Sequence, residues 1–372
     1  MRSISAFAPG RVNLIGEHTD YNAGLSLPFA LPLGTSVTLT ERADDRVLVS
    51  SREAGAWSGT LADIEAGGVA GGVAGWAGYV AGVLWALGSA GHRIPGCEIE
   101  LASTVPLGAG LSSSASLECA VATAVAGLLG LPLDDPGRRA LAAACTRAET
   151  EYVGAPTGGL DQLAAMLGAE GEAVLIDFAD HSAHRVPLHL AEAGLAILVT
   201  DTGVRHELAA GGGYADRRAE CEAAAQALGI ASLREAAAAD VTRLAASPGG
   251  SVTTRRARHV VTENERVLAA VAATGAGDWA GLGRLLTASH ASLRDDFEVT
   301  VPALDLAAAT AEAHGALGAR MTGGGFGGST IALLPLDRAD AVREAIDGAF
   351  AGAGLPRPAH HLVEPSGGAR LG

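Results

Sequence analysis

The 372-residue chain contains no lysine, so all 26 of its Lys+Arg residues are arginine. This absence excludes the phosphate loop that ends in Gly-Lys-Ser/Thr, and it excludes protein kinases, which carry a lysine on their third strand. It also excludes pyridoxal-phosphate enzymes, because they hold their cofactor through a Schiff-base lysine. Any site for an anionic ligand must therefore use arginine side chains, backbone N–H groups or a metal ion.

Aromatic residues and cysteines are also scarce, at 4% of the chain and four residues respectively. With few aromatic side chains, the core must be filled mainly by Ala, Val and Leu. The four cysteines form no Cys-x-x-Cys pair, which argues against a disulfide framework and against a thiolate zinc site. Because the first 20 residues also lack the apolar core of a signal peptide, we expect a cytoplasmic protein.

The sequence predicts neither nucleic acid nor a membrane as a partner. The net charge of −15 disfavours binding to nucleic acid or to an anionic lipid surface. The uncharged residues 66–91 are long enough to cross a membrane, but their first half is mostly glycine and other small residues. Their second half predicts one helix with an apolar face formed by Trp76, Val80, Val83, Leu84 and Leu87. We therefore expect a buried helix there.

The length and the pattern of the chain predict two closely joined α+β domains, at residues 1–180 and 181–372. The tail after Pro365 is expected to be loose. Strands are expected at 11–15, 36–40, 97–101, 173–178, 195–200 and 330–334, and helices at 113–129, 136–153 and 339–350. Residues 207–320 are expected to be mostly helical.

Residues 105–116 join an apolar strand to an alanine-rich helix through glycine and serine residues. Glycines let a backbone come close to a phosphate, and the N–H groups at a helix start point at the anion. A tight turn without a ligand is an equally good explanation of this loop alone. A dinucleotide fingerprint is a weaker one, because the acidic strand end that it requires about 20 residues later falls in a loop at 131–136.

Two further segments favour a ligand site. Residues 323–328 contain five glycines directly before a strand, and ordering so many glycines is costly for a turn without a role. Residues 11–22 place Glu17, His18 and Asp20 beside an apolar strand, which suits a ligand with many hydroxyl groups. A metal site made of these three residues and a solvated turn are the alternatives.

Three motifs of the chain resemble, in order, those of the galactokinase family of GHMP kinases, the superfamily of galactose, homoserine, mevalonate and phosphomevalonate kinases. Residues 10–22 resemble the galactokinase signature, and residues 106–116 resemble the lysine-free ATP loop of the superfamily. Residues 321–330 are similar to its closing glycine loop, although Ser329 stands where cysteine is common. Supporting matches lie at 256–261 and 289–299, so the resemblance spans essentially the whole chain and is weakest at 207–250.

The resemblance implies a ribosomal-S5-like N-terminal domain and a ferredoxin-like C-terminal domain, with the active site between them. It implies transfer of the γ-phosphoryl group of MgATP to the anomeric hydroxyl of galactose. Ser114 and Glu149 would hold Mg²⁺, and the ATP phosphates would be bound by Gly108, Ala109, Gly110, Leu111, Ser112, Ser113 and Ser114.

The resemblance also implies the residues of the sugar site and of the chemistry. Asp161 would accept the proton of the reacting hydroxyl, with Arg11 beside it to keep the carboxylate ionised. The sugar would be bound by Glu17, His18, Thr19, Asp20, Gly158 and Tyr214. Without the resemblance, Asp161 is better explained as a favourable acid at a helix start, and Glu149 as half of a surface ion pair.

Two alternatives to this function remain open at the level of sequence. One is a related kinase that acts on N-acetylgalactosamine, arabinose or another small alcohol. The other is a catalytically silent sugar sensor, although the intact serine loop, Asp161 and Arg11 disfavour it. Small molecules are the only partners expected, and a monomer is favoured.

Overall fold

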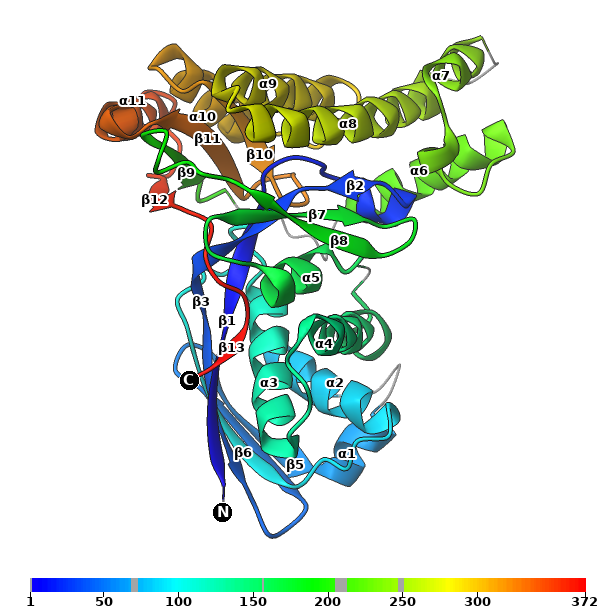
Figure 1. The fold of residues 1–372 in the computed structure, drawn as a ribbon, viewed down its shortest axis with the longest axis vertical. Helices are drawn as coiled ribbons and strands as arrows, with labels where there is room; N and C mark the ends of the chain where they lie inside the picture. Colours follow the sequence, from blue (N-terminus) through cyan, green and yellow to red (C-terminus); the bar gives the residue numbers. More distant parts are fainter. Residues whose placement is uncertain (1, 68–72, 156, 205–212, 247–250) are drawn as a thin grey trace.

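The computed structural model describes residues 2–67, 73–155, 157–204, 213–246 and 251–372. It contains two α+β units stacked end to end, with a small sheet where they meet (Figure 1). The N-terminal unit lies in the lower half of the view, and the C-terminal unit lies above it.

The N-terminal unit is a sheet covered on one face by helices (Figure 1). Its strand order is β13-β1-β3-β6-β4-β5, and every neighbouring pair is antiparallel except β4 and β6. The strands are β1 (Ser3–Asn13), β3 (Pro28–Glu41), β4 (Arg46–Ser51), β5 (Gly55–Thr60), β6 (Cys97–Ser103) and β13 (Arg370–Leu371). The helices are α1 (Leu61–Ala66), α2 (Trp76–Ser89), α3 (Ser113–Leu129), α4 (Asp135–Arg147) and α5 (Leu160–Leu167).

Small side chains fill the core of this unit, as the composition predicts. Helix α3 is buried on almost all sides because it consists largely of Ala and Val, which allow it to lie close against β1 and β3. Helix α2 buries Val80, Val83, Leu84 and Leu87, which confirms the expected apolar face. Among the described residues, no helix is long and apolar enough to cross a membrane.

The C-terminal unit is built on an antiparallel sheet of order β10-β11-β9-β12. Its strands are β9 (Leu195–Asp201), β10 (Gly318–Thr322), β11 (Ser329–Pro335) and β12 (Ala359–Val363). Its helices are α6 (Gly213–Leu228), α7 (Ala238–Ala245), α8 (Ser251–Ala276), α9 (Trp279–Asp295), α10 (Pro302–Ala313) and α11 (Ala339–Gly352). The small sheet consists of β2 (Leu25–Ser26), β7 (Glu172–Asp177) and β8 (Ser182–Pro187).

The end of the chain corrects one expectation. The tail after Pro365 is not loose, because it runs back along the N-terminal unit and adds β13 to the edge of its sheet. The backbone N–H of Ser366 donates to Ala30 O at 2.8 Å, and that of Gly368 donates to Gly168 O at 2.7 Å. The Arg370 guanidinium lies 4.4 Å from the centre of the Phe7 ring. Backbone hydrogen bonds hold this segment in place. Because the segment has no apolar run, its sequence does not predict a strand.

Candidate active site

The serine- and glycine-rich loop at residues 105–116 leads from β6 into the start of α3. Gly108, Gly110 and Ser112 have φ angles of 71°, 74° and 59°, so the backbone turns through left-handed conformations at all three. Ser112 precedes α3, but its hydroxyl does not cap the helix, because it donates to Asp161 Oδ2. The N–H groups of the first turn of a helix have no acceptor within that helix. The start of α3 is therefore suited to bind an anion.

The second glycine loop lies directly against the first. A Cβ atom on Gly323 would lie 3.1 Å from Gly110 O, and one on Gly328 would lie 3.3 Å from Ala109 O. Both glycines also have positive φ angles. The Ser329 hydroxyl donates to Ala109 O at 2.6 Å, across 220 residues of sequence. The glycines of residues 323–328 thus allow a close backbone approach that side chains would prevent.

Arg11 and Asp161 form a partly buried pair beside this loop. The Arg11 Nε–H donates to Asp161 Oδ1 at 2.6 Å, and its Nη1 donates to Gly110 O at 2.8 Å. The side chain of Arg11 is 9% exposed and that of Asp161 is 22% exposed. Asp161 lies in the first turn of α5, after Gly159 in a left-handed conformation. The pair joins β1, α5 and the phosphate loop, and it leaves part of the carboxylate open to a ligand.

Glu149 lies on the other side of the α3 start. The predicted helix at 136–153 ends as α4 at Arg147 and continues as a π-helical turn, Ala148–Val153, which carries Glu149. Such turns are frequent at functional sites. The Glu149 carboxylate accepts one hydrogen bond from the Ser114 hydroxyl and another, of 2.6 Å, from Gln162 Nε2. Burial, reinforced by the charge of Asp161, raises the pKa of Glu149 to about 7.

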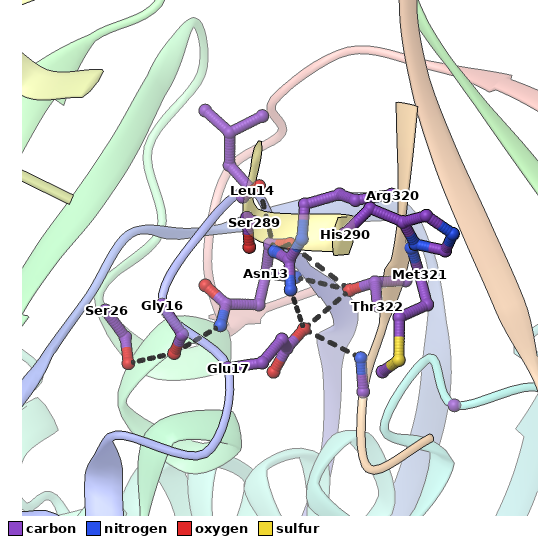
Figure 2. A network of polar contacts seen from close by, with 12 residues as sticks. Asn13, Leu14, Gly16, Glu17, Ser26, Ser289, His290, Arg320, Met321 and Thr322 are labelled. Atoms are coloured by element: carbon purple, nitrogen blue, oxygen red, sulfur yellow. Dashed lines mark hydrogen bonds and ion pairs between the residues drawn. The ribbon is translucent and has the colours of Figure 1, made fainter. Parts of the chain in front are cut away.

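The signature residue Glu17 is bound mainly by the C-terminal unit. Its Oε1 accepts hydrogen bonds from Gly323 N at 2.7 Å and from the Thr322 hydroxyl at 3.1 Å. Arg320 Nη2 lies 3.5 Å from the same oxygen. Figure 2 shows the Glu17 carboxylate between the end of β1 and the strand β10. One carboxylate oxygen of Glu17 therefore joins the sugar signature to the second glycine loop.

His18 and Thr19 are buried within the signature loop. His18 has a left-handed backbone (φ 61°), its Nδ1 lies 2.9 Å from the Tyr21 hydroxyl, and its ring lies 4.8 Å from that of Phe297. Burial lowers the pKa of His18 to about 3, so its ring is neutral. The Thr19 hydroxyl contacts Gly16 O and Leu25 O. The Thr19 side chain thus contacts its own loop and the neighbouring strand β2, and its contact with a sugar stays a prediction.

Asp20, Gly158 and Tyr214 come together next to this loop. A Cβ atom on Gly158 would overlap the Asp20 side chain, so a larger residue there would displace the Asp20 carboxylate. Burial raises the pKa of Asp20 to about 6, and the nearby charges of Asp161 and Glu17 act in the same direction. Burial also raises the pKa of the Tyr214 hydroxyl well above its usual range, with Asp20 and Asp161 contributing. All the sequence-predicted site residues therefore lie around Asp161 or in the loops beside it.

Three buried charged residues and one buried amide were missed by sequence reasoning. Arg320 is fully buried and donates from Nη1 to Asn13 O at 3.2 Å and to Leu14 O at 3.0 Å (Figure 2). Glu263 in α8 accepts from Gly16 N at 3.0 Å. Glu118 and Gln162 adjoin Glu149. A charge inside an otherwise apolar segment is the signal that could have found Glu118, in residues 113–129, but it does not apply to the amide Gln162.

The metal alternative for Glu17, His18 and Asp20 gains no support. Across the part of the chain that the structure describes, no group of three or more His, Cys, Asp or Glu side chains is arranged to hold a metal ion. One of the two Glu17 carboxylate oxygens, Oε1, already accepts hydrogen bonds from Thr322 and Gly323.

Comparison with known proteins agrees with the geometry. Residues 78–169 match the GHMP kinases N terminal domain, and residues 268–352 match the GHMP kinases C terminal domain. Solved mevalonate kinase has the same fold at a TM-score of 0.66 and 16% identity, over 100% of this chain and 99% of that one. The chain is thus a phosphotransferase of the GHMP kinase class, with the expected two-domain α+β fold.

The more similar relatives narrow this class. Residues 2–40 match the galactokinase galactose-binding signature. The chain is 47% identical to a galactokinase of Streptomyces coelicolor over 98% of its own length and 92% of the relative. It is 48% identical to one of Mycobacterium tuberculosis, with 96% of each covered. The structure of Lactococcus lactis galactokinase complexed with galactose matches at a TM-score of 0.90 and 34% identity, over 99% of this chain and 95% of that one. The chain belongs to the galactokinase family.

Proposed function

We propose that this protein transfers the γ-phosphoryl group of MgATP to the anomeric hydroxyl of D-galactose, which gives galactose 1-phosphate and ADP. The observation that carries the proposal is the position of Asp161. Its carboxylate is held by Arg11 and Ser112 at the start of α3, where a phosphate is favoured, and it lies near Asp20 of the sugar signature. A proton acceptor between a phosphate site and a hydroxyl site is what a sugar kinase requires.

The phosphates of ATP are bound by the backbone of residues 108–114 and by Arg11. Because the chain has no lysine, guanidinium and N–H groups supply the positive potential of the site. Arg11 already donates to Gly110 O and Asp161, so it is oriented before a ligand arrives. Orientation of the phosphoryl group and neutralisation of its charge are the main contributions in such reactions, because the transition state is loose.

Ser114 and Glu149 are the residues that would hold Mg²⁺. Their hydroxyl and carboxylate oxygens are the ligands that this ion prefers, and two side chains are enough because phosphates and water complete its coordination. The raised pKa of Glu149, about 7, indicates a buried carboxylate that needs more positive charge around it. When bound, the ion would neutralise charge that develops on the phosphoryl group.

Galactose is held by Asp20 with Gly158 and Tyr214, beside Glu17, His18 and Thr19. The Asp20 carboxylate accepts hydrogen bonds from sugar hydroxyls, and Gly158 leaves the space that this contact needs. A buried acceptor that loses its donor costs about 1–3 kcal/mol, so the orientation of a single hydroxyl affects binding strongly.

The reaction follows from these positions. The anomeric oxygen bonds to the γ-phosphorus as the bond from that phosphorus to the bridging oxygen of ADP breaks. The hydroxyl proton passes to Asp161. A carboxylate is a far weaker base than the alkoxide of a sugar hydroxyl, so the proton moves late, once the new O–P bond is forming.

We also propose that the protein acts in the cytoplasm as a monomer. Its four cysteines are free and buried, which suits a reducing compartment. Sedimentation of the purified protein tests the monomer, and an assembled dimer would contradict it.

A coupled assay with ATP, Mg²⁺ and a panel of free sugars tests the function, with phosphorus NMR to locate the new phosphate. We expect galactose to be used with the highest kcat/KM and to be phosphorylated at the anomeric oxygen. Preference for N-acetylgalactosamine or arabinose would overturn the choice of substrate. Binding of sugar and ATP without turnover would indicate a sensor instead.

A further inference from the structure

A buried amide links two acidic side chains below the proposed metal site. Gln162 follows Asp161 in α5 and is fully buried. Its Nε2 lies 2.6 Å from Glu149 Oε2 and 3.0 Å from Glu118 Oε2. A side-chain amide has two N–H donors, so it donates one to each carboxyl group. Glu118, Gln162 and Glu149 form a carboxyl–amide bridge that connects α3, α5 and the π-helical turn.

The burial of the Glu118 carboxyl group costs folding free energy. Glu118 lies in α3, is fully buried, and its Oε1 has no hydrogen-bond partner among the described residues. Burial raises the pKa of its carboxyl well above the usual range, and the charge of Glu149 adds to this. An apolar residue of similar size would be more stable there. The hydrogen bond that Glu118 accepts from Gln162 offsets part of this cost.

We propose that Glu118 and Gln162 are positioning residues that fix the Glu149 carboxylate for Mg²⁺ bound with the nucleotide. This inference rests on the proposed function, which makes Glu149 a ligand. With one N–H of Gln162 held by Glu118, the other is fixed toward Glu149 Oε2. The carboxylate then cannot rotate freely, so it and the Ser114 hydroxyl that donates to it are oriented together for the metal ion. Hydrogen bonds of this kind to a ligating carboxylate commonly determine metal affinity.

The bridge also ties the metal site to the proton acceptor. Asp161 and Gln162 are neighbours in the first turn of α5, so one rigid segment carries the base and the amide that orients Glu149. A shift of Gln162 would therefore change the distance between the base and the metal ion.

Helix packing alone is the competing explanation, because the contact also joins α3 to α5. The chain offers a matched control for it. The Thr123 hydroxyl contacts Met166 Sδ at 3.9 Å, and this buried polar contact joins the same two helices farther from the site. Loss of packing should therefore affect Thr123→Val and Gln162→Met alike, whereas loss of ligand positioning should affect only Gln162→Met.

Calorimetric titration of the full chain with ADP, in the presence and absence of Mn²⁺, tests the inference. The ratio of the two affinities measures what the protein adds to metal binding. We expect Gln162→Met to reduce this ratio by about 10–100-fold, the usual effect of losing a partner of a metal ligand. Glu118→Met should reduce it less, and Glu118→Gln should restore it, because its amide oxygen still accepts from Gln162. Thr123→Val and galactose binding without nucleotide should not change.

Each outcome decides a separate point. An unchanged ratio in Gln162→Met, with a normal effect of Mn²⁺ in the wild type, would overturn the bridge and leave the kinase proposal intact. An equal loss in Thr123→Val would assign the effect to helix packing. If the wild type showed no effect of Mn²⁺ on ADP affinity, Glu149 would not be a ligand, and both the metal assignment and this inference would be wrong. If Gln162→Met does not fold, the pair Glu118→Met and Glu118→Gln decides.

Discussion

The phosphate side and the sugar side of the proposed site differ in which parts of the chain form them. On the proposed phosphate side, the groups assigned to the phosphates are the backbone of residues 108–114 and the start of α3, and contiguous sequence supplies nearly all of them. On the sugar side, the signature loop is held by groups of the C-terminal unit: Glu17 by the Thr322 hydroxyl and the Gly323 N–H, and Gly16 by the Glu263 carboxylate. The groups assigned to the phosphates thus come from one local motif, which the C-terminal unit contacts through Ser329, whereas the signature loop is held by several groups of that unit.

Asp161 is where the two sides meet, and its removal should have the largest effect. Asp161→Ala is expected to lower kcat by about 10²–10⁴-fold, the usual contribution of a positioned proton acceptor. Affinities for ATP and galactose should change far less than kcat, because Arg11 keeps its hydrogen bond to Gly110 O and the contacts proposed for Asp20 are left in place. Steady-state kinetics together with calorimetry of each ligand would measure this. A turnover within a few-fold of the wild type would show that Asp161 does not accept the proton.

Arg320 tests whether the sugar side depends on the C-terminal unit. Arg320→Met removes a fully buried cation that binds Asn13 O and Leu14 O and lies beside Glu17. Breaking such a buried pair costs about 3–5 kcal/mol, so we expect this loss of stability in urea unfolding. In the protein that remains folded, galactose affinity should fall more than ATP affinity.

An exposed arginine provides the control for that variant. Arg338 lies on the surface of the same unit, so Arg338→Met should change stability by no more than about 0.5 kcal/mol. If Arg320→Met weakened ATP and galactose binding equally, the distinction between the two sides would fail.

The sequence could predict the phosphate side because its signals are local. The Gly/Ser run before an Ala-rich segment predicts a helix at 113–129, and α3 has these bounds. The expected strands at 36–40, 97–101, 195–200 and 330–334 all lie within observed strands. The family resemblance and the α+β fold are confirmed by the comparisons.

The rest of the site depends on contacts between residues far apart in the sequence, which no local pattern predicts. Glu17 and Gly323 are 306 residues apart, so the sequence alone assigned Glu17 only to the sugar. The π-helical turn that carries Glu149 has the same composition as an ordinary helix end. Gln162 gave no signal because an amide in a helix is usually exposed. These are the positions where tertiary packing, and not propensity, decides the role of a residue.

Ser329 offers a perturbation limited to the phosphate side. Ser329→Ala removes the buried hydroxyl that donates to Ala109 O and leaves this carbonyl without that donor, at a cost of about 1–3 kcal/mol. We expect KM for ATP to rise and the affinity for galactose to stay unchanged. Ser329→Cys, with a weaker donor, should give an intermediate KM. A change in galactose affinity equal to that in ATP would show that the two sides are coupled through the glycine loops.

Protonation of Asp20 should perturb the sugar side alone, and with the smallest effect. Its pKa of about 6 means that the carboxylate becomes protonated as the pH falls below 6. Because sugar hydroxyls donate to the ionised form, galactose affinity should fall by up to about tenfold for each pH unit below 6 and level off above it. Calorimetry without nucleotide or metal isolates this from the titration of Glu149. Asp20→Asn cannot titrate, so its weaker affinity should be the same from pH 5 to 7. A wild-type affinity that is constant over this range would mean that Asp20 does not accept hydrogen bonds from the sugar, and the sugar side would then depend on groups that do not change charge.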